Sequence, residues 1–341
     1  MPEHGAAPVA GGDGATPAEV SRLWQMADII TPFALRVAAT LRLADHVVAG
    51  ATEVPALARL TGADPDALRR LLRYLAARDL FAEPEPGRFA LTGLGAVLRD
   101  DHPTATRRWL DLEGFGGTMD LAFVDLLTAI RTGRPPRSAE ESELSDPVSE
   151  SFDDVMESQS RQQTPAIVAA FDWTTARHVV DLGGGTGTLL VGLLRAYPAM
   201  RGTLVELPRT AERARPVIAG AGLAERCRVV AGDLFEVALP AADVYVLKFL
   251  LHGYDDDRAA AALRRCREAG EAGARVLVIE RTVAPGEDYA PFTAMDLRML
   301  ILTGGRERTL DEYAALARRA GLRVHAATPT PVDVHVIVLS P

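Results

Sequence analysis

The sequence predicts an α/β protein in which a mainly parallel sheet ends in an antiparallel hairpin, preceded by a mostly helical domain. Three observations support this fold class. From about residue 166, short apolar runs alternate with helical stretches, as in a sheet covered by helices on both faces. The last two runs, 322–328 and 334–339, are separated by too few residues for a crossover, so they must be antiparallel. Residues 18–103 instead show mostly helical spacing, with a short hairpin pattern inside this range at 80–92.

Composition and charge exclude several classes of protein. The 341 residues predict two domains, and 24% charged with 48% hydrophobic residues is ordinary globular composition. A net charge of -9 argues against a nucleic-acid partner, because phosphate neutralisation supplies most of that affinity. The two cysteines, Cys227 and Cys266, provide neither a disulfide framework nor a metal site, which favours a reducing, cytoplasmic location. We find no membrane-spanning run and no signal peptide.

The amino-terminal part divides into a tail and a helical domain. Residues 1–17 are rich in Gly, Ala and Pro and are predicted to be disordered. Helical spacing over 18–48 and 66–77 is followed by a hairpin pattern over 80–92, which is typical of a winged-helix unit. Such a unit can bind DNA, but seven arginines against five acids over 59–99 is a weak excess. A structural or dimerisation module is therefore the favoured interpretation.

The rest of the chain consists of connecting helices and the sheet domain. Residues 104–165 are predicted to be mostly helical, with an exposed polar loop over 134–146, and residues 166–341 form the α/β domain. Before the final hairpin, the expected strands are 178–182, 203–207, 227–231, 244–251 and 275–280, and helices are expected at 189–196 and 258–269.

A glycine-rich loop follows the first of these strands. Residues 181–187 read DLGGGTG, and glycines there let the backbone turn sharply near a ligand. The G-x-G-x-x-G spacing of a dinucleotide site fails, since Thr188 or Leu190 stands where the third glycine would fall. Glu206 ends the second strand and can accept hydrogen bonds from both ribose hydroxyls. The pattern therefore favours a nucleoside ligand without a pyrophosphate over a simple tight turn.

Two further segments fall on the same edge of the predicted sheet. After the third strand, Asp233 can accept from an exocyclic amine such as that of adenine, while Leu234 or Phe235 packs on the ring. The alternative for Asp233 is a loop cap. After the fourth strand stands His252, and an imidazole with a pKa near ~6.5 suits deprotonation of a hydroxyl at neutral pH.

Two acids are expected to reach this histidine. Glu280 ends the fifth strand, and Glu307 lies in the segment GGRERT. A carboxylate on the second ring nitrogen would fix the tautomer and raise the basicity. A helix-entry role for Glu307 is less favoured, because Thr309 and Glu312 already form a capping box.

These motifs together resemble a known family. DLGGGTG, VELP, GDLF, LKFLLHGYDDDRA, VIERT and GGRERTLDEYAALARRAGL occur in the order found in S-adenosylmethionine-dependent O-methyltransferases of the plant caffeate/chalcone type. Their actinobacterial relatives, which tailor aromatic polyketides and related antibiotics, share that order. The resemblance extends from about Leu23 to the end of the chain. It implies a Rossmann-like sheet, a winged-helix dimerisation domain, S-adenosyl-L-methionine as cofactor and a homodimer.

The resemblance also implies roles for individual residues. The cofactor site would be lined by Gly183, Gly185, Glu206, Asp233, Leu234 and Lys248. The general base would be His252, flanked by Glu280 and Glu307. A spaced helix leading into the site matches Phe152, Met156 and Ser160, with the methionine on the acceptor and the serine near the cofactor's carboxylate. The acceptor-pocket helix matches Met295, Asp296 and Met299.

The chain departs from the family pattern beside the histidine. Gly253-Tyr254 stand where the family usually has Asp-Trp, so substrate placement should differ from that of the plant enzymes. Glu206 stands where many relatives carry Asp, a change that keeps the ribose contact.

The amino-terminal helices carry more apolar surface than a small domain can bury. Leu23, Trp24, Met26, Ile30 and Leu35 lie on more than one face, which predicts an obligate dimer. Arg22 and Trp24 are expected to reach the acceptor pocket of the partner subunit.

The function expected from these observations is methylation of an aromatic hydroxyl on a small natural-product intermediate. No Asp/Glu/His metal cluster is visible, which argues against the magnesium-dependent catechol type. Two alternatives remain: a relative that decarboxylates or hydroxylates, and a ligand-sensing winged-helix regulator. The His252 cluster favours methylation over the first, and the acidic balance argues against the second.

Overall fold

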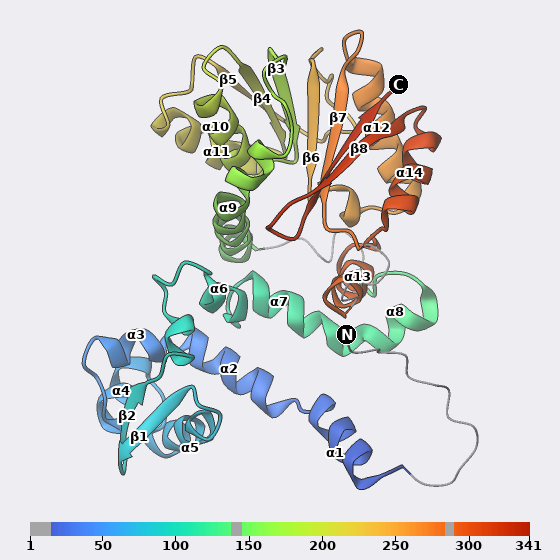
Figure 1. Ribbon diagram of the computed structural model, residues 1–341. Coiled ribbons are helices and arrows are strands. Elements are labelled where there is room, and N and C mark those ends of the chain that lie inside the picture. The colour runs from blue at the N-terminus through green and yellow to red at the C-terminus, as the bar shows by residue number, and fades with distance from the viewer. Residues whose placement is uncertain (1–14, 138–144, 284–289) are drawn as a thin grey trace. The chain divides into compact units, whose positions relative to one another are not determined.

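The computed structural model describes residues 15–137, 145–283 and 290–341, and the chain forms two compact units, 1–102 and 103–341 (Figure 1). The predicted tail over 1–17 and the predicted loop over 134–146 therefore lie mostly outside the described residues. Within the described part, Thr16 caps the first helix, which begins at Pro17.

The first unit is a small helical domain that carries a two-stranded hairpin. Asp64 caps α5 through Asp66 and Ala67, and Leu68, Leu72 and Leu75 of that helix are buried. The strands pair antiparallel, with Phe81 opposite Leu91. A helix that leads directly into a hairpin is the winged-helix arrangement predicted from the sequence. Its elements are α1 (Pro17–Met26), α2 (Ile30–Thr40), α3 (Leu43–Val48), α4 (Val54–Thr61), α5 (Pro65–Ala76), β1 (Phe81–Glu85), β2 (Arg88–Leu91) and η1 (Gly95–Leu98).

The second unit contains a group of helices followed by the α/β sheet. The preceding helices are α6 (Thr106–Leu110), α7 (Phe115–Leu121), η2 (Ala122–Asp125), α8 (Leu126–Thr132) and α9 (Asp146–Ala169). The sheet strands are β3 (His178–Leu182), β4 (Arg201–Glu206), β5 (Cys227–Ala231), β6 (Val244–Lys248), β7 (Arg275–Glu280), β8 (Arg323–Pro329) and β9 (His335–Ser340). The helices among them are α10 (Thr188–Ala196), α11 (Pro208–Gly220), η3 (Leu251–Gly253), α12 (Asp256–Ala269), α13 (Ala290–Leu302) and α14 (Leu310–Arg319).

The seven strands form one sheet in the order β5-β4-β3-β6-β7-β9-β8. Neighbours from β5 to β7 are parallel, whereas β9 runs antiparallel to both β7 and β8. The strand order reverses between β3 and β6, and ligands bind at the carboxyl ends of strands at such a switch point. The predicted fold class is therefore confirmed, including the carboxyl-terminal hairpin.

Alternation along the strands builds a core on each face of the sheet. Val180 and Leu182 pack toward α12 and α14, whereas Val179 packs toward α10 and α11. Figure 1 shows the two helix pairs on opposite sides of the strands. Because successive residues of a strand point to opposite faces, a buried strand covered on both sides reads as a continuous apolar run.

The fourth strand ends earlier than the sequence suggested. β6 stops at Lys248 rather than 251, since Phe249 has a φ of 48°, in the left-handed region. The chain then makes the short turn η3, which carries His252. Apolar residues 249–251 continue the strand pattern in sequence, but the backbone has already left the sheet. No helix in the described residues is long and apolar enough to span a membrane.

Candidate active site

The glycine loop lies directly at the carboxyl end of β3. Gly183 and Gly185 both have positive φ, 66° and 61°, which favours glycine. A Cβ on Gly185 would meet nothing within 4 Å, so the backbone there faces open space. A Cβ on Gly184 would meet the carboxylate of Asp181 at 2.3 Å, so the turn packs tightly on its own strand. The loop therefore exposes bare backbone at Gly185, while at Gly184 it packs against Asp181.

Glu206 ends β4 beside this loop. Its Oε1 accepts from the backbone N–H of Gly185 at 3.1 Å, and its Oε2 accepts from Leu207 N–H. Burial raises the pKa of Glu206 to about 7 against the lowering effect of these two hydrogen bonds. Asp233, after β5, uses Oδ1 to accept from the N–H of Phe235 at 2.8 Å. Glu206 and Asp233 are thus aligned on one edge, and each also holds its own loop.

A buried acid and the chain's only lysine lie beneath the same loop. Asp181 is 1% exposed, and in the described residues neither of its carboxylate oxygens has a hydrogen-bond partner. Burial raises the pKa of Asp181 to about 7, and Lys248 opposes this. Burial likewise lowers the pKa of Lys248 to about 8. The open backbone at Gly185 and the Glu206 carboxylate fit a nucleoside whose hydroxyls donate hydrogen bonds.

His252 and two carboxylates form a cluster at the ends of β6 and β7. The Nδ1 atom of His252 lies 2.8 Å from Oε1 of Glu307 and 3.7 Å from Oε2 of Glu280. Both carboxylates are fully buried, while the histidine side chain is 16% exposed. With a carboxylate on Nδ1, the neutral ring carries its proton there and leaves Nε2 as the acceptor. The structure therefore brings together the three residues that the sequence placed on separate motifs.

The two acids act on the histidine in different ways. Oε1 of Glu280 accepts from three consecutive backbone N–H groups, those of Leu250, Leu251 and His252, at 2.9–3.3 Å. Glu280 therefore holds the backbone of the turn, whereas Glu307 holds the ring. Burial lowers the pKa of His252, but the two carboxylates outweigh it, so the net pKa is raised. Burial raises the pKa of Glu280.

Glu307 is itself positioned by the acceptor-pocket helix. Its backbone N–H donates to Oδ1 of Asp296 on α13 at 2.9 Å. Asp296 was expected to line the acceptor pocket, and that role stays a prediction. Its neighbours Met295 and Met299 do line a cavity.

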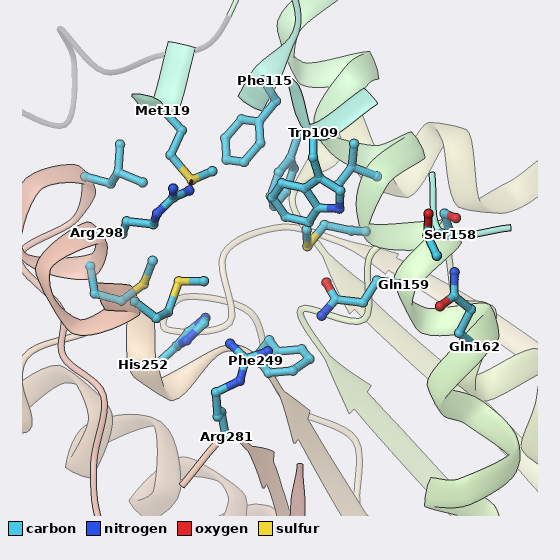
Figure 2. Close-up of a pocket in the computed structure, with 17 residues that line it drawn as sticks. Trp109, Phe115, Met119, Ser158, Gln159, Gln162, Phe249, His252, Arg281 and Arg298 are labelled. Atoms are coloured by element: carbon cyan, nitrogen blue, oxygen red, sulfur yellow. Dashed lines mark hydrogen bonds between the residues drawn. The ribbon is translucent and has the colours of Figure 1, made fainter. Parts of the chain in front are cut away.

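That cavity has a volume of about 440 Å³ and opens in front of His252 (Figure 2). Its walls are mostly aromatic rings and methionines, with arginines at two points. Of the residues predicted to contact an acceptor, its lining contains Met156, Met295 and Met299, and Phe152 of the same predicted helix also lines it. Residues that sequence reasoning missed include Trp109, Phe115, Met119, Gln159, Gln162, Phe249, Arg281 and Arg298.

Some of the missed residues carried a detectable signal. Phe152, Met156 and Gln159 follow helical spacing on α9, so the lining face of that helix could have been extended from two of its members. Trp109 and Met119 carried none, because they come from short helices with no strand to place them. Ser160 of α9 is half-buried, and its carbonyl accepts from Thr164, while Ser158 and Gln159 line the cavity. Arg22 and Trp24 are exposed on α1.

The described residues contain no group of three His, Cys, Asp or Glu side chains placed to hold a metal ion. Both cysteines are buried free thiols, and burial raises the pKa of each.

The carboxyl edge of the sheet fits a nucleoside, and the apolar cavity is lined by a histidine that is hydrogen-bonded to a buried carboxylate. Together these features are typical of a group-transfer enzyme with a Rossmann-like fold. The chain belongs to the O-methyltransferase family, because residues 132–323, more than half of it, match the O-methyltransferase domain. Residues 24–101 match the O-methyltransferase dimerisation domain. The family predicted from the six motifs is thereby confirmed.

Characterised relatives share most of the chain. It is 45% identical over 311 residues (89% of this chain, 93% of the relative) to 2,7-dihydroxy-5-methyl-1-naphthoate 7-O-methyltransferase of Streptomyces carzinostaticus. It is 41% identical over 331 residues (92% of this chain, 88% of the relative) to aclacinomycin 10-hydroxylase RdmB of Streptomyces purpurascens. A crystal structure of an O-methyltransferase of neocarzinostatin biosynthesis, with S-adenosyl-L-homocysteine and 1,4-dihydroxy-2-naphthoic acid, has a TM-score of 0.86 at 43% identity, covering 93% of this chain and 98% of that one.

Proposed function

We propose that this protein transfers the methyl group of S-adenosyl-L-methionine to a hydroxyl of a small aromatic natural-product intermediate of the polyketide, naphthoic or benzoic acid type. The observation that carries the proposal is the position of His252. Its ring lines an apolar cavity while its Nδ1 is bound by the buried Glu307 at 2.8 Å. The naphthoate methyltransferase relative supports the substrate class.

The cofactor would be held along the carboxyl edge of the sheet. When bound, S-adenosylmethionine supplies a methyl group that its sulfonium sulfur already makes electrophilic. Glu206 would accept from the ribose hydroxyls, and Asp233 from the adenine amine. The bare backbone of Gly185 would allow close approach, Gly183 would form the turn beside it, and Lys248 would provide positive charge. Three more contacts are proposed, from Leu234, Phe235 and Ser160.

His252 would act as the general base. A phenol has a pKa near ~10 by analogy with Tyr, so removal of its proton in the reaction typically adds ~10²–10⁴-fold to the rate. Glu307 would keep Nε2 free to take that proton, and Glu280 would hold the turn. Both carboxylates stabilise the imidazolium that results, since they raise the pKa of His252. Orientation of the acceptor by the cavity walls contributes the rest.

The acceptor pocket would be built from both aromatic and methionine side chains. A cavity of about 440 Å³ is within the usual ~300–1,000 Å³ range of small-molecule sites. Met156, Met295 and Met299 would pack against the faces and edges of a flat ring. Asp296 would contribute indirectly, through its hydrogen bond to the Glu307 backbone.

We further propose a homodimer in which Arg22 and Trp24 complete the acceptor pocket of the partner subunit. The match to the dimerisation domain supports the assembly. So does the exposure of Trp24 (73%) and Met26 (76%), which leaves apolar surface uncovered in a single chain. A cytoplasmic location is part of the proposal, supported by the two free thiols.

Hydroxylation is the second candidate, because one relative at 41% identity is named as a hydroxylase. Mass spectrometry with methyl-labelled S-adenosylmethionine separates the two reactions. A panel of phenols, hydroxybenzoic acids and hydroxynaphthoic acids should give at least one product that carries the labelled methyl group. The product should be strongly reduced with His252→Ala. A product that instead gains one oxygen atom, with no label, would replace methylation by hydroxylation.

A further inference from the structure

Two arginines line the cavity, and they differ in how their charge is neutralised. Arg298, on α13, forms an ion pair with Asp120 at 3.0 Å, where the side chains are 28% and 14% exposed. It also lies over the ring of Phe123 at 5.8 Å. Because both members of this pair are well shielded from solvent, Asp120 neutralises the charge of Arg298, and the ion pair links α13 to α7.

Arg281 has a weaker counterion. It follows β7 directly, and its Nε donates to Oδ2 of Asp333 at 2.8 Å. The Asp333 side chain is 72% exposed, whereas that of Arg281 is 20% exposed. A carboxylate so far into solvent is strongly screened, so it neutralises the guanidinium only in part.

The guanidinium of Arg281 lies beside the proposed base. Figure 2 shows Arg281 next to Phe249 and close to His252 at the floor of the cavity. Its central carbon is 6.0 Å from the Phe249 ring centroid. Its positive charge acts on His252 and opposes protonation of that ring. The cavity therefore contains a partly neutralised cation whose charge reaches the ring of the proposed base.

We propose that Arg281 is a specificity residue that binds a carboxylate carried by the aromatic acceptor, next to the hydroxyl that is methylated. This inference rests on the proposed function. A guanidinium recognises a carboxylate through two parallel N–H···O bonds, and such charge-assisted bonds are about twice as strong as neutral ones. In an apolar cavity, an acceptor without that anion leaves the cation desolvated and poorly paired. The same residue thus favours hydroxy acids and disfavours neutral phenols.

The experiment compares two acceptors that differ by one group, 3-hydroxy-2-naphthoic acid and 2-naphthol. Binding to the protein with S-adenosylhomocysteine is measured by calorimetry, and methylation is measured as kcat/KM. We expect Arg281→Gln to weaken binding of the acid by about 10- to 100-fold, the range for lost charge-assisted hydrogen bonds. Binding of 2-naphthol should hold or tighten, because the substitution removes a cation that a neutral acceptor leaves poorly paired. Arg281→Lys should fall between Gln and wild type for the acid.

Asp333→Asn is the matched control. It removes the exposed counterion but keeps the guanidinium, so binding of the acid should hold or tighten. Equal losses for both acceptors with Arg281→Gln would overturn the proposal, because the residue would then stabilise the phenolate or the fold. No loss for the acid would also overturn it. Acid discrimination in binding without any methyl transfer would leave this inference standing and refute the proposed function instead.

Discussion

Arg308 and Asp256 form an ion pair in which Nη2 and Nε of the arginine lie 2.8 and 3.0 Å from one carboxylate oxygen. The arginine side chain is 1% exposed. Its remaining N–H groups donate to the carbonyls of Leu251 and Tyr254, at 2.9 and 2.8 Å. These carbonyls flank His252, and Arg308 directly follows Glu307. One guanidinium therefore fixes both the turn of the proposed base and the loop of its carboxylate.

Replacing Arg308 is expected to loosen this turn. Arg308→Met leaves the carbonyls of Leu251 and Tyr254 without these donors, and an unsatisfied buried hydrogen-bonding group costs about 1–3 kcal/mol. Asp256→Asn keeps the donors but leaves the 1% exposed guanidinium without its counterion, so it should also destabilise the fold. Chemical denaturation of both variants measures the difference. Equal unfolding free energies for Arg308→Met and wild type would show that the turn holds without the arginine.

His252→Ala should reduce turnover by about 10²–10⁴-fold and leave the affinity for S-adenosylhomocysteine nearly unchanged, because proton removal belongs to the chemical step. Because the substitution also leaves the buried Glu307 without its partner at Nδ1, stability has to be measured beside turnover. Kinetics and thermal melts of the same preparations test this. A variant that melts like wild type and still methylates at nearly full rate would show that orientation alone is sufficient.

The pH dependence of turnover should depend on Glu307, because this carboxylate raises the pKa of His252. In the wild type the pKa of His252 is raised, so turnover should rise with pH through a midpoint above the ordinary value of ~6.5. Glu307→Gln removes one of the two carboxylates that raise it, so the midpoint should move to lower pH. Turnover at the plateau should fall by less than in His252→Ala, because the base remains. A midpoint that does not move would separate Glu307 from the titration of the ring.

Affinity for S-adenosylhomocysteine should depend on the ionisation of Glu206. Its pKa is raised to about 7, and ribose hydroxyls donate to the ionised carboxylate. Binding should therefore weaken as the pH falls from 8 to 6. Glu206→Ala should cost about 1–3 kcal/mol of binding, the range for an unsatisfied hydrogen-bonding group. Glu206→Gln is the control, since it keeps the shape and loses the titration. Tight binding of NAD, or unchanged affinity in Glu206→Ala, would contradict the ribose assignment.

The exposed apolar residues of α1 and α2 should be covered by a second copy. Leu23, Trp24 and Met26 are 66–76% exposed in the single chain. We expect a dimer with an interface above about 2,000 Å² in total, as in obligate assemblies. Met26→Asp should produce monomers or aggregates, whereas Val124→Asp, at an equally exposed apolar position of the other unit, tests whether that surface also contributes. Light scattering that finds a monomeric wild type at micromolar concentration would refute the dimer.

The sequence by itself determined the sheet and the polar residues at its edge. Val179, Val246 and Leu277 lie in runs that must be buried on both faces, so the strands could be placed to within a few residues. Gly183, Glu206 and His252 each follow a strand, and the carboxyl ends of parallel strands meet at one edge. Their convergence was therefore predictable without coordinates. The capping box at Thr309 was equally local and was confirmed.

Only the tertiary structure decided how the site is supported and enclosed. The backbone leaves the sheet at Phe249, which has a left-handed conformation. An apolar residue after a strand does not predict that conformation. Asp296 reaches the Glu307 backbone across eleven residues, and Arg281 and Arg298 acquire different environments from the acids that they meet, Asp333 and Asp120. Such pairings depend on where helices pack rather than on spacing along the chain. The charge and walls of the acceptor cavity are set by contacts that a linear pattern does not encode.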